Sequence, residues 1–285
     1  MSYIEAIVLG LVQGLCEFLP VSSSGHLVLF QNLFGLSENA SENQLTVVLL
    51  HVATLIAVVV AFHKLIGRLF CAFGRIVKNI VTGKFSWKNI EGDEKLLILM
   101  VISTCLLIPF VLIADQIEAL LSSLLLVGVA LLVTAFLLTL ADYVTRKYKQ
   151  IGRKGKSGSM LTVKDSIIVG LFQCLALVPG ISRSGSTITA GMLCGFDRKQ
   201  AVEYSFILSL PAIVGSAILK VGDAVELLPT VDIGPYLVGM LVAAVSGYLA
   251  IKLVELVVSK DKFGAFAYYC GAVGIFSIIY AIVTR

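Results

Sequence analysis

The sequence predicts an all-α polytopic membrane protein with six transmembrane helices plus two re-entrant helical hairpins in an inverted-topology repeat. Of the 285 residues, 58% are hydrophobic and 14% are charged, with a mean hydropathy of +0.97. Soluble domains carry about 25% charged residues, so a soluble fold is disfavoured. Six apolar stretches approach the roughly 20 residues that cross a hydrocarbon core. Two further apolar regions share one motif and are each interrupted by polar turn residues.

The six predicted transmembrane helices have almost no charge in their interiors. Lys252 and Glu255 are the exceptions, and both lie near one end of a stretch, where long side chains can reach the interface. Pro109 and Pro211 fall inside two stretches, where a proline kinks or breaks a helix. The stretches cover residues 45–62, 96–114, 120–141, 203–221, 236–257 and 265–283.

Residues 3–34 and 163–195 are apolar regions of a different kind. Each contains Pro, Gly and a Ser cluster near its middle, and neither half is long enough to span a membrane alone. A helix, a polar turn and a second helix returning to the same side fits both regions. We therefore expect two re-entrant hairpins.

The charged segments predict the orientation. Residues 63–95 and 142–164 each carry seven Lys or Arg residues, and cytoplasmic loops are enriched in these residues. Residues 37–44, 115–119 and 222–235 carry only acidic charge. We therefore expect the two basic segments to be cytoplasmic loops and both termini to be extracytoplasmic.

An internal repeat relates the two hairpin regions at an offset of 160 residues. Three predicted spans separate the hairpins, and an odd number inverts the second repeat relative to the first. This predicts one integral membrane domain over residues 1–285, with repeats of about 1–141 and 163–285 joined by the basic loop 142–164. Transporters commonly use such repeats, with sites where broken helices meet near the midplane. The matches pair Ile7, Gly10, Leu11, Gln13, Leu15, Ser22, Ser24 and Gly25 with Ile167, Gly170, Leu171, Gln173, Leu175, Ser182, Ser184 and Gly185.

The first polar turn combines a carboxylate, hydroxyls and an imidazole. A carboxylate inside a membrane costs roughly 2.5–3.5 kcal/mol on insertion scales, so Glu17 needs a partner or a function. Serine hydroxyls and unpaired amides at a helix start can bind an anion. His26 is suited to proton transfer near neutral pH. The turn contains Gln13, Glu17, Pro20, Ser22, Ser23, Ser24, Gly25 and His26.

The second polar turn places Arg183 at the position of Ser23 in the first. An arginine in an apolar region is costly unless it meets an anion, and its planar donors match phosphate oxygens. A permanent salt bridge between Arg183 and Glu17 is the alternative, and the two interpretations are compatible. Together the turns predict a pocket for a phosphorylated ligand with a lipid tail. This turn contains Pro179, Gly180, Ser182, Arg183, Ser184, Gly185, Ser186 and Thr187.

These two segments resemble the signature motifs of the bacterial undecaprenyl-diphosphate phosphatases of the bacitracin-resistance type. The family pattern (Glu or Gln)-x-x-x-Glu matches Gln13 and Glu17, and Pro-Val-Ser-Ser-x-Gly-His matches residues 20–26. The motif Pro-Gly-x-Ser-Arg-Ser-x-x-Thr matches residues 179–187 in full, and the Glu-Tyr-Ser-Phe run at 203–206 is also similar. The resemblance covers essentially the whole chain.

The resemblance implies hydrolysis of undecaprenyl diphosphate to undecaprenyl phosphate and inorganic phosphate in the bacterial cell (inner) membrane. It implies a divalent cation, Mg²⁺ or Ca²⁺, a site opening to the outer face, and bacitracin resistance when the enzyme is abundant. Many members have Glu where this chain has Gln13, and an amide binds a divalent cation less well than a carboxylate. The expected partners are the polyprenyl diphosphate lipid and bilayer lipid, with a homodimer possible and no nucleic acid.

We assign roles to the site residues as a hypothesis. Ser23 is the candidate nucleophile, and His26 or Glu17 would accept its proton. Arg183, the turn amides and a metal at Glu17 would neutralise charge on the diphosphate. In the rival mechanism a metal-bound water attacks and Ser23 is only a ligand. The expected substrate-binding residues are Gln13, Ser22, Ser24, Gly25, Gln173, Ser182, Ser184 and Thr187.

Two other classes of function stay open, a transporter and a structural membrane protein without a small-molecule site. A transporter of a polyprenyl phosphate carrier would also explain the inverted repeat. The type-2 phosphatidic acid phosphatases carry out similar chemistry, but they need a downstream catalytic His paired with Asp. His51 and His63 do not supply that context.

Overall fold

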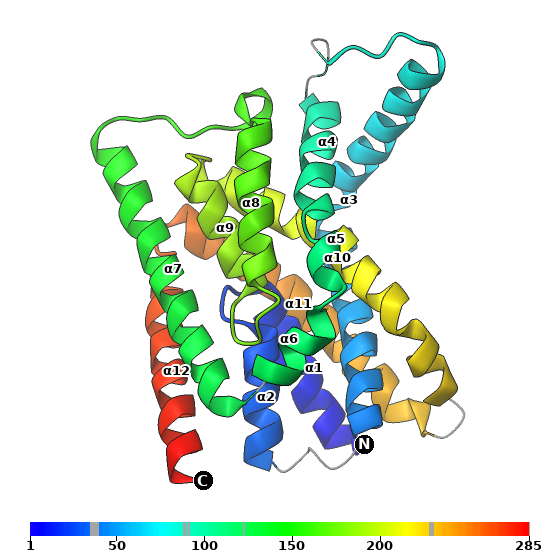
Figure 1. The fold of residues 1–285 in the computed structure, drawn as a ribbon, viewed down its shortest axis with the longest axis vertical. Coiled ribbons are helices and arrows are strands. Elements are labelled where there is room, and N and C mark those ends of the chain that lie inside the picture. Colours follow the sequence, from blue (N-terminus) through cyan, green and yellow to red (C-terminus); the bar gives the residue numbers. More distant parts are fainter. Residues whose placement is uncertain (35–39, 88–89, 91, 122, 228–230, 285) are drawn as a thin grey trace.

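The computed structural model of this chain consists of α-helices joined by linkers (Figure 1). It describes residues 1–34, 40–87, 90, 92–121, 123–227 and 231–284. The helices are α1 (Tyr3–Phe18), α2 (Ser23–Phe34), α3 (Ala40–Val81), α4 (Gly92–Cys105), α5 (Ile108–Val111), α6 (Ala114–Leu121), α7 (Leu124–Gln150), α8 (Val163–Leu175), α9 (Arg183–Leu193), α10 (Arg198–Leu227), α11 (Ile233–Ser259) and α12 (Ala265–Val283).

Six helical segments of the described chain are long and apolar enough to cross a membrane, which confirms the predicted number of spans. Each predicted stretch overlaps one of them, and the last matches it residue for residue. The segments are Leu45–Val81, Gly92–Val111, Leu124–Gln150, Arg198–Leu219, Ile233–Ser259 and Ala265–Val283.

Two helices extend well beyond the predicted spans. Helix α3 bends at Phe62, where the predicted span ends, and then continues to Val81. Helix α7 continues to Gln150. The prediction that 63–95 and 142–164 are loops is therefore wrong for the first part of each segment. Lys and Arg form helices well, and in a last turn they interact favourably with the helix dipole, so basic charge marks the interface without ending the helix.

The two prolines behave differently. Pro109 breaks the predicted stretch 96–114, because α4 ends at Cys105 and α5 begins at Ile108. It lies in the first turn of α5, where backbone N–H groups have no partner within the helix, so the N–H that proline lacks is not needed. Pro211 lies inside α10, which continues on both sides of it.

The interrupted regions form two helix pairs that approach each other from opposite ends of the molecule. In Figure 1, α1 (dark blue) rises from the lower end and α8 (green) descends from the upper end. The turn between α1 and α2 and the turn between α8 and α9 lie near the middle of the view. Residues from the two interrupted regions are thus brought together at mid-height.

Close helix packing holds the first turn in place. Helix α1 lies against α11, and a Cβ at Gly10 would be 2.4 Å from the carbonyl oxygen of Gly239. Glycine is therefore required at that crossing. Phe18, at the end of α1, is fully buried. Helix α7 runs beside α12 along the other flank (Figure 1).

The chain termini and the two basic linkers lie at opposite ends of the molecule. Figure 1 places both termini at one end and the linkers that follow α3 and α7 at the other. Two of the acidic segments on which the predicted orientation depends, 37–44 and 222–235, fall partly outside the described residues.

Candidate active site

The first turn is held by hydrogen bonds that Ser22 accepts. Helix α1 ends at Phe18, and α2 begins at Ser23. Ser22 has a φ of 72°, in the left-handed region that residues other than glycine rarely adopt. Its hydroxyl accepts a hydrogen bond from the Gly25 N–H at 3.2 Å, and its carbonyl accepts one from the His26 N–H. Ser22 therefore caps α2 through its side chain.

The second turn repeats this arrangement. The Ser182 hydroxyl accepts a hydrogen bond from the Gly185 N–H at 3.1 Å and caps α9. The hydroxyls of Ser182 and Ser184 are 3.3 Å apart, the same separation as between the hydroxyls of Ser22 and Ser24. Both predicted turns thus use the first serine of a Ser-x-Ser-Gly run to cap the following helix.

The two turns contact each other directly. The Gly180 N–H donates to the Ser24 hydroxyl at 3.4 Å, and the Ser184 hydroxyl donates to the Leu19 carbonyl at 3.2 Å. Gly180 has a φ of 95°, and a Cβ there would be 2.7 Å from the carbonyl oxygen of Val127 on α7. A glycine is needed at 180 because this backbone conformation and this close approach both exclude a side chain.

The Glu17 carboxylate lies at the centre of the contact between the turns. Arg183 Nη2 contacts its Oε1 atom, so the residues from the two turns form an ion pair. Its Oε2 atom accepts a hydrogen bond from the Ser23 hydroxyl at 2.8 Å and one from Gln13 Nε2 at 3.0 Å. His51 Nε2, from α3, is 3.7 Å from the same oxygen.

Burial gives this cluster its chemical character. The Glu17 side chain is 6% exposed and the Arg183 side chain 18% exposed, whereas Ser23 is partly exposed. Charges that are poorly screened by water attract more strongly. The cluster therefore presents a cation and a hydroxyl, with an adjacent carboxylate as proton acceptor, to a ligand that enters beside Ser23.

His26 points to other partners. Its Nδ1 atom is 2.8 Å from the Ser22 carbonyl oxygen and its Nε2 atom is 2.9 Å from the Tyr269 hydroxyl. A carbonyl can only accept, so Nδ1 carries the proton and Nε2 accepts from Tyr269. Both ring nitrogens are therefore occupied by groups other than the Ser23 hydroxyl, the proposed proton donor.

The remaining predicted residues divide into two groups. Ser22, Ser182 and Ser184 form the turns, and Thr187 donates to the Arg183 carbonyl at 2.9 Å while also bonding the Ser205 hydroxyl. Gly25 lies in the contact between the turns, because a Cβ there would be 3.1 Å from Gly180.

In the second group, buried amide atoms have no partner. Among the described residues, Gln13 Oε1 and both polar atoms of Gln173 are buried without a hydrogen bond. Buried polar atoms normally find a partner in protein or ligand. These two glutamines are 160 residues apart in sequence, the offset that relates the two turn segments, and are available to a bound molecule or to water.

Three residues in contact with the site were missed by the sequence reasoning. His51 carried a usable signal, because an ionisable residue inside an apolar stretch is a functional candidate by default. Tyr269 and Thr134 carried none, since single hydroxyls in apolar helices are common. Thr134 Oγ1 donates to the Gly180 carbonyl and accepts from the Ser182 N–H, both at 3.1 Å, and so ties α7 to the second turn.

The oxygen atoms at the centre fit a divalent cation only in part. No group of three or more His, Cys, Asp or Glu residues in the described chain could hold a metal ion. Glu17 offers a carboxylate, and the unpartnered Oε1 of Gln13 offers an amide oxygen. Mg²⁺ is often bound by one or two carboxylates with substrate phosphates completing its shell. The donors present fit a cation shared with a phosphorylated ligand.

Comparison with known proteins identifies the family of the chain. The family model described as bacitracin resistance protein BacA matches residues 6–276. The chain is 39% identical to an undecaprenyl-diphosphatase of Desulforapulum autotrophicum, with 98% of both chains covered. It is 39% identical to one of Halothermothrix orenii, with 99% of both covered, and 41% identical to one of Desulfosudis oleivorans, with 96% and 97% covered. The chain therefore belongs to the bacitracin resistance protein BacA family.

Proposed function

We propose that this chain hydrolyses undecaprenyl diphosphate to undecaprenyl phosphate and inorganic phosphate, and so recycles the lipid carrier of cell-wall synthesis. The observation that carries the proposal is the buried pair of Glu17 and Arg183 beside the partly exposed Ser23 hydroxyl. Relatives about 39% identical over nearly the whole chain bear the name undecaprenyl-diphosphatase, which supports it. Bacitracin resistance follows when the enzyme is abundant, because less diphosphate remains for the drug.

The diphosphate binds between the two turns. The Arg183 guanidinium has five N–H donors, and its Nη2 atom contacts Glu17, so further donors are available to a phosphate oxygen. The Gly25 and Gly185 amides are occupied by the serine caps. The amides in the first turns of α2 and α9 ahead of them can bind the anion, assisted by both helix dipoles.

Ser23 attacks the terminal phosphorus. Its hydroxyl proton passes to Glu17, which already accepts its hydrogen bond at 2.8 Å. A bond forms from Ser23 Oγ to phosphorus while the bond to the bridging oxygen breaks, and undecaprenyl phosphate leaves. Arg183 stabilises the charge that develops on the phosphate oxygens. Water then cleaves the phosphoserine to release inorganic phosphate.

His51 then accepts from Glu17 the proton that Ser23 released. Its Nδ1 atom is 2.7 Å from the Val47 carbonyl oxygen, so Nδ1 carries a proton, and in the neutral ring Nε2 carries the lone pair. That lone pair lies 3.7 Å from the Glu17 carboxylate. His26 holds the first turn in place through Ser22 and Tyr269.

Direct attack by water is the rival mechanism, in which Ser23 binds the phosphate and forms no bond to phosphorus. Acid quenching during turnover, followed by peptide mapping, distinguishes the two. A phosphorylated peptide containing Ser23 is expected. Substantial turnover by Ser23→Ala would instead support water as the nucleophile.

We expect Mg²⁺ or Ca²⁺ to be held jointly by Glu17, the Gln13 amide oxygen and the diphosphate. When bound, the ion supplies positive charge that neutralises the phosphate oxygens. Because the amide is a weaker ligand than a carboxylate, the cation should bind measurably only when substrate or product is present.

The membrane arrangement that we propose has two re-entrant hairpins, α1–α2 and α8–α9, in an inverted repeat of about 1–141 and 163–285 within one domain. The opposed directions of the two helix pairs and the matching serine caps support it (Figure 1). Both termini are extracytoplasmic, the basic segments are cytoplasmic, and the site opens to the outer face. Cysteine labelling of exposed residues in intact cells tests this orientation.

Movement of a polyprenyl phosphate carrier is the second candidate function. The observation that favours it is the opposed pair of hairpins, which a hydrolase does not need and which many transporters use. The assembly that we propose is a homodimer, which native mass spectrometry tests.

The decisive assay measures inorganic phosphate released from undecaprenyl diphosphate by purified protein, with added cation and with a chelator. Hydrolysis that depends on the cation is expected. Well-folded protein that releases no phosphate with cation present would refute the hydrolase. A fluorescent polyprenyl phosphate in vesicles would then test carrier movement.

A further inference from the structure

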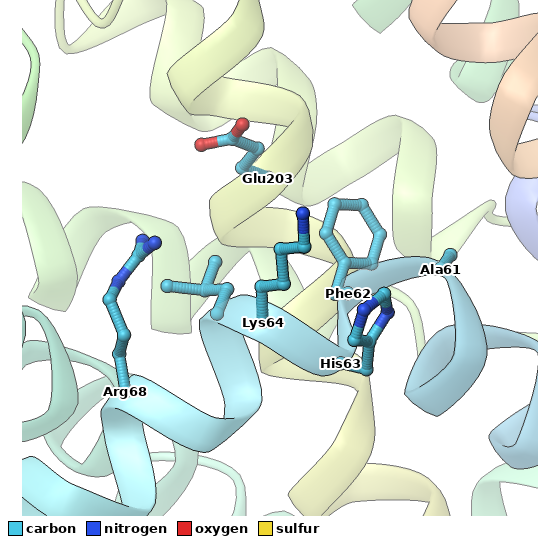
Figure 2. Close-up of a pocket in the computed structure, with 7 residues that line it drawn as sticks. Ala61, Phe62, His63, Lys64, Arg68 and Glu203 are labelled. Carbon is cyan, nitrogen blue, oxygen red and sulfur yellow. The ribbon is translucent and has the colours of Figure 1, made fainter.

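A cavity lies at the bend of α3, away from the cluster at Glu17. Its volume is about 330 Å³, at the lower end of the roughly 300–1,000 Å³ of small-molecule sites. Phe62, His63, Lys64 and Arg68 of α3 line it together with Glu203 of α10. Figure 2 shows the Lys64 and Arg68 side chains extending from α3 toward the level of Glu203.

The bend creates the cavity. Phe62 has φ −116° and ψ 22° inside the long helix, although α3 contains no proline. His63 Nδ1 is 3.0 Å from the Val60 carbonyl oxygen, so the side chain donates to a carbonyl at the bend. Side-chain bonding of this kind can kink a helix without proline.

The charged groups of the cavity are only partly neutralised. Arg68 pairs with Asp93 at 3.3 Å, and Glu203 is 3.8 Å from Lys199. Within the described chain, Lys64 makes no ion pair or hydrogen bond. The lining therefore combines an uncommitted ammonium, a guanidinium that is already paired with Asp93, and the Glu203 carboxylate, with the Asp197 and Glu255 carboxylates near Glu203.

Glu203 is the residue of the Glu-Tyr-Ser-Phe run whose role the proposed reaction leaves open. Tyr204 hydrogen-bonds Ser103 at 2.8 Å, and Ser205 hydrogen-bonds Thr187 at 2.6 Å. Phe206 packs between Phe18 and Phe62, with ring centroids 5.6 and 6.1 Å away. The run thus connects the cavity at the bend to the turns at the candidate active site.

We propose that this cavity binds a singly protonated phosphate group, that of a lipid monophosphate or inorganic phosphate. Lys64 and Arg68 provide cations for the phosphate oxygens. Glu203 accepts a hydrogen bond from the P–OH group. A phosphate diester has no such hydrogen, and its charge is repelled by the carboxylate, so the cavity selects against diesters.

The position of the cavity in the orientation proposed above favours a lipid as the source. There the cavity faces the cytoplasmic side, where basic pockets between membrane helices bind lipid headgroups. Val59 and Val60, one turn before Lys64, are 44% and 55% exposed and offer an apolar surface to a lipid tail. Both alternative ligands are products of the proposed reaction. That link to catalysis rests on the proposed function, whereas phosphate binding does not.

The test measures binding to purified full-length protein by native mass spectrometry. The probes are a polyprenyl monophosphate, inorganic phosphate as competitor, and phosphatidylglycerol as the diester. Wild-type protein and Arg183→Ala are both used, since the latter weakens binding between the turns. Lys64→Gln is compared with Lys78→Gln, a lysine of the same helix outside the cavity.

Lys64→Gln should weaken monophosphate binding about tenfold, the value of one charge-assisted hydrogen bond, while Lys78→Gln leaves it unchanged. Glu203→Gln should lower the preference for monophosphate over diester. If inorganic phosphate displaces the polyprenyl monophosphate, and the displacement depends on Lys64, the site binds the free ion. If inorganic phosphate does not displace the polyprenyl monophosphate, the site binds the lipid. Equal binding of diester and monophosphate by the wild type, or equal effects of the two lysine variants, would overturn the proposal. These results are readable even if the protein hydrolyses nothing.

Discussion

Replacing Arg183 tests whether its ion pair with Glu17 has a structural role or a catalytic one. In Arg183→Ala the Glu17 carboxylate keeps its bonds to Ser23 and Gln13 and its neighbour His51, but it loses its cation. Removing one partner of a buried pair costs about 3–5 kcal/mol. Because these contacts remain, we expect a loss of stability near the lower end, about 3 kcal/mol.

That loss corresponds to a fall in melting temperature of about 6–12 °C, at roughly 2–4 °C per kcal/mol for a large domain. Hydrolysis should fall by about 100-fold to 1,000-fold, since an electrostatic stabiliser of the transition state is lost.

Arg146→Ala is the control. Its side chain is 63% exposed in a pair with Asp142, so its effect on stability should be below about 1 kcal/mol.

The double variant Glu17→Gln/Arg183→Ala decides between the two interpretations. It removes both charges while an amide can still accept a hydrogen bond from Ser23, so most of the stability should return. Activity should not return. Thermal unfolding in detergent and phosphate release are measured on the same samples. Recovery of both stability and turnover in the double variant would show that the pair is purely structural and would refute the catalytic role.

Further predictions concern Ser23 and Gln13 of the first turn and Tyr269 of α12, which contacts His26. Ser23→Ala should retain less than about a tenth of the phosphate-release rate, because the nucleophile is missing; a higher retained rate would contradict attack by Ser23. Gln13→Glu should lower the cation concentration needed for half-maximal activity, since a second carboxylate binds the ion better; an unchanged cation titration would remove Gln13 from the cation site. Tyr269→Phe should lower the stability by about 1–3 kcal/mol, as measured by thermal unfolding, because the buried His26 loses its hydrogen-bond donor. An unchanged melting temperature would show that this bond contributes little.

Much of the fold could be predicted because the membrane restricts it so strongly. Uninterrupted apolar stretches of about 20 residues have few alternatives to a spanning helix, and the last span, 265–283, is predicted to the residue. The extent of α3 beyond Phe62 and of α7 beyond residue 141 could not be predicted from hydropathy, because charged residues at an interface continue a helix as readily as they end it.

The centre of the candidate site was predictable because buried charge is rare in membranes. Glu17 and Arg183 are conspicuous in apolar surroundings, and the structure brings them into contact. The direction of His26 was not predictable, because it depends on Tyr269, which lies 243 residues away in sequence. The approach of His51 depends in the same way on how α3 packs against the first turn.

The most direct test of the central claim asks whether one diphosphate contacts both turns. A non-hydrolysable polyprenyl diphosphate analogue carrying a photoreactive group beside its phosphates would be crosslinked to purified protein, and the labelled peptides mapped. We expect labels in both the segment 13–26 and the segment 173–187, with strong reduction of both in Arg183→Ala. Labelling confined to one segment, or unaffected by loss of Arg183, would contradict a single site formed between the two turns.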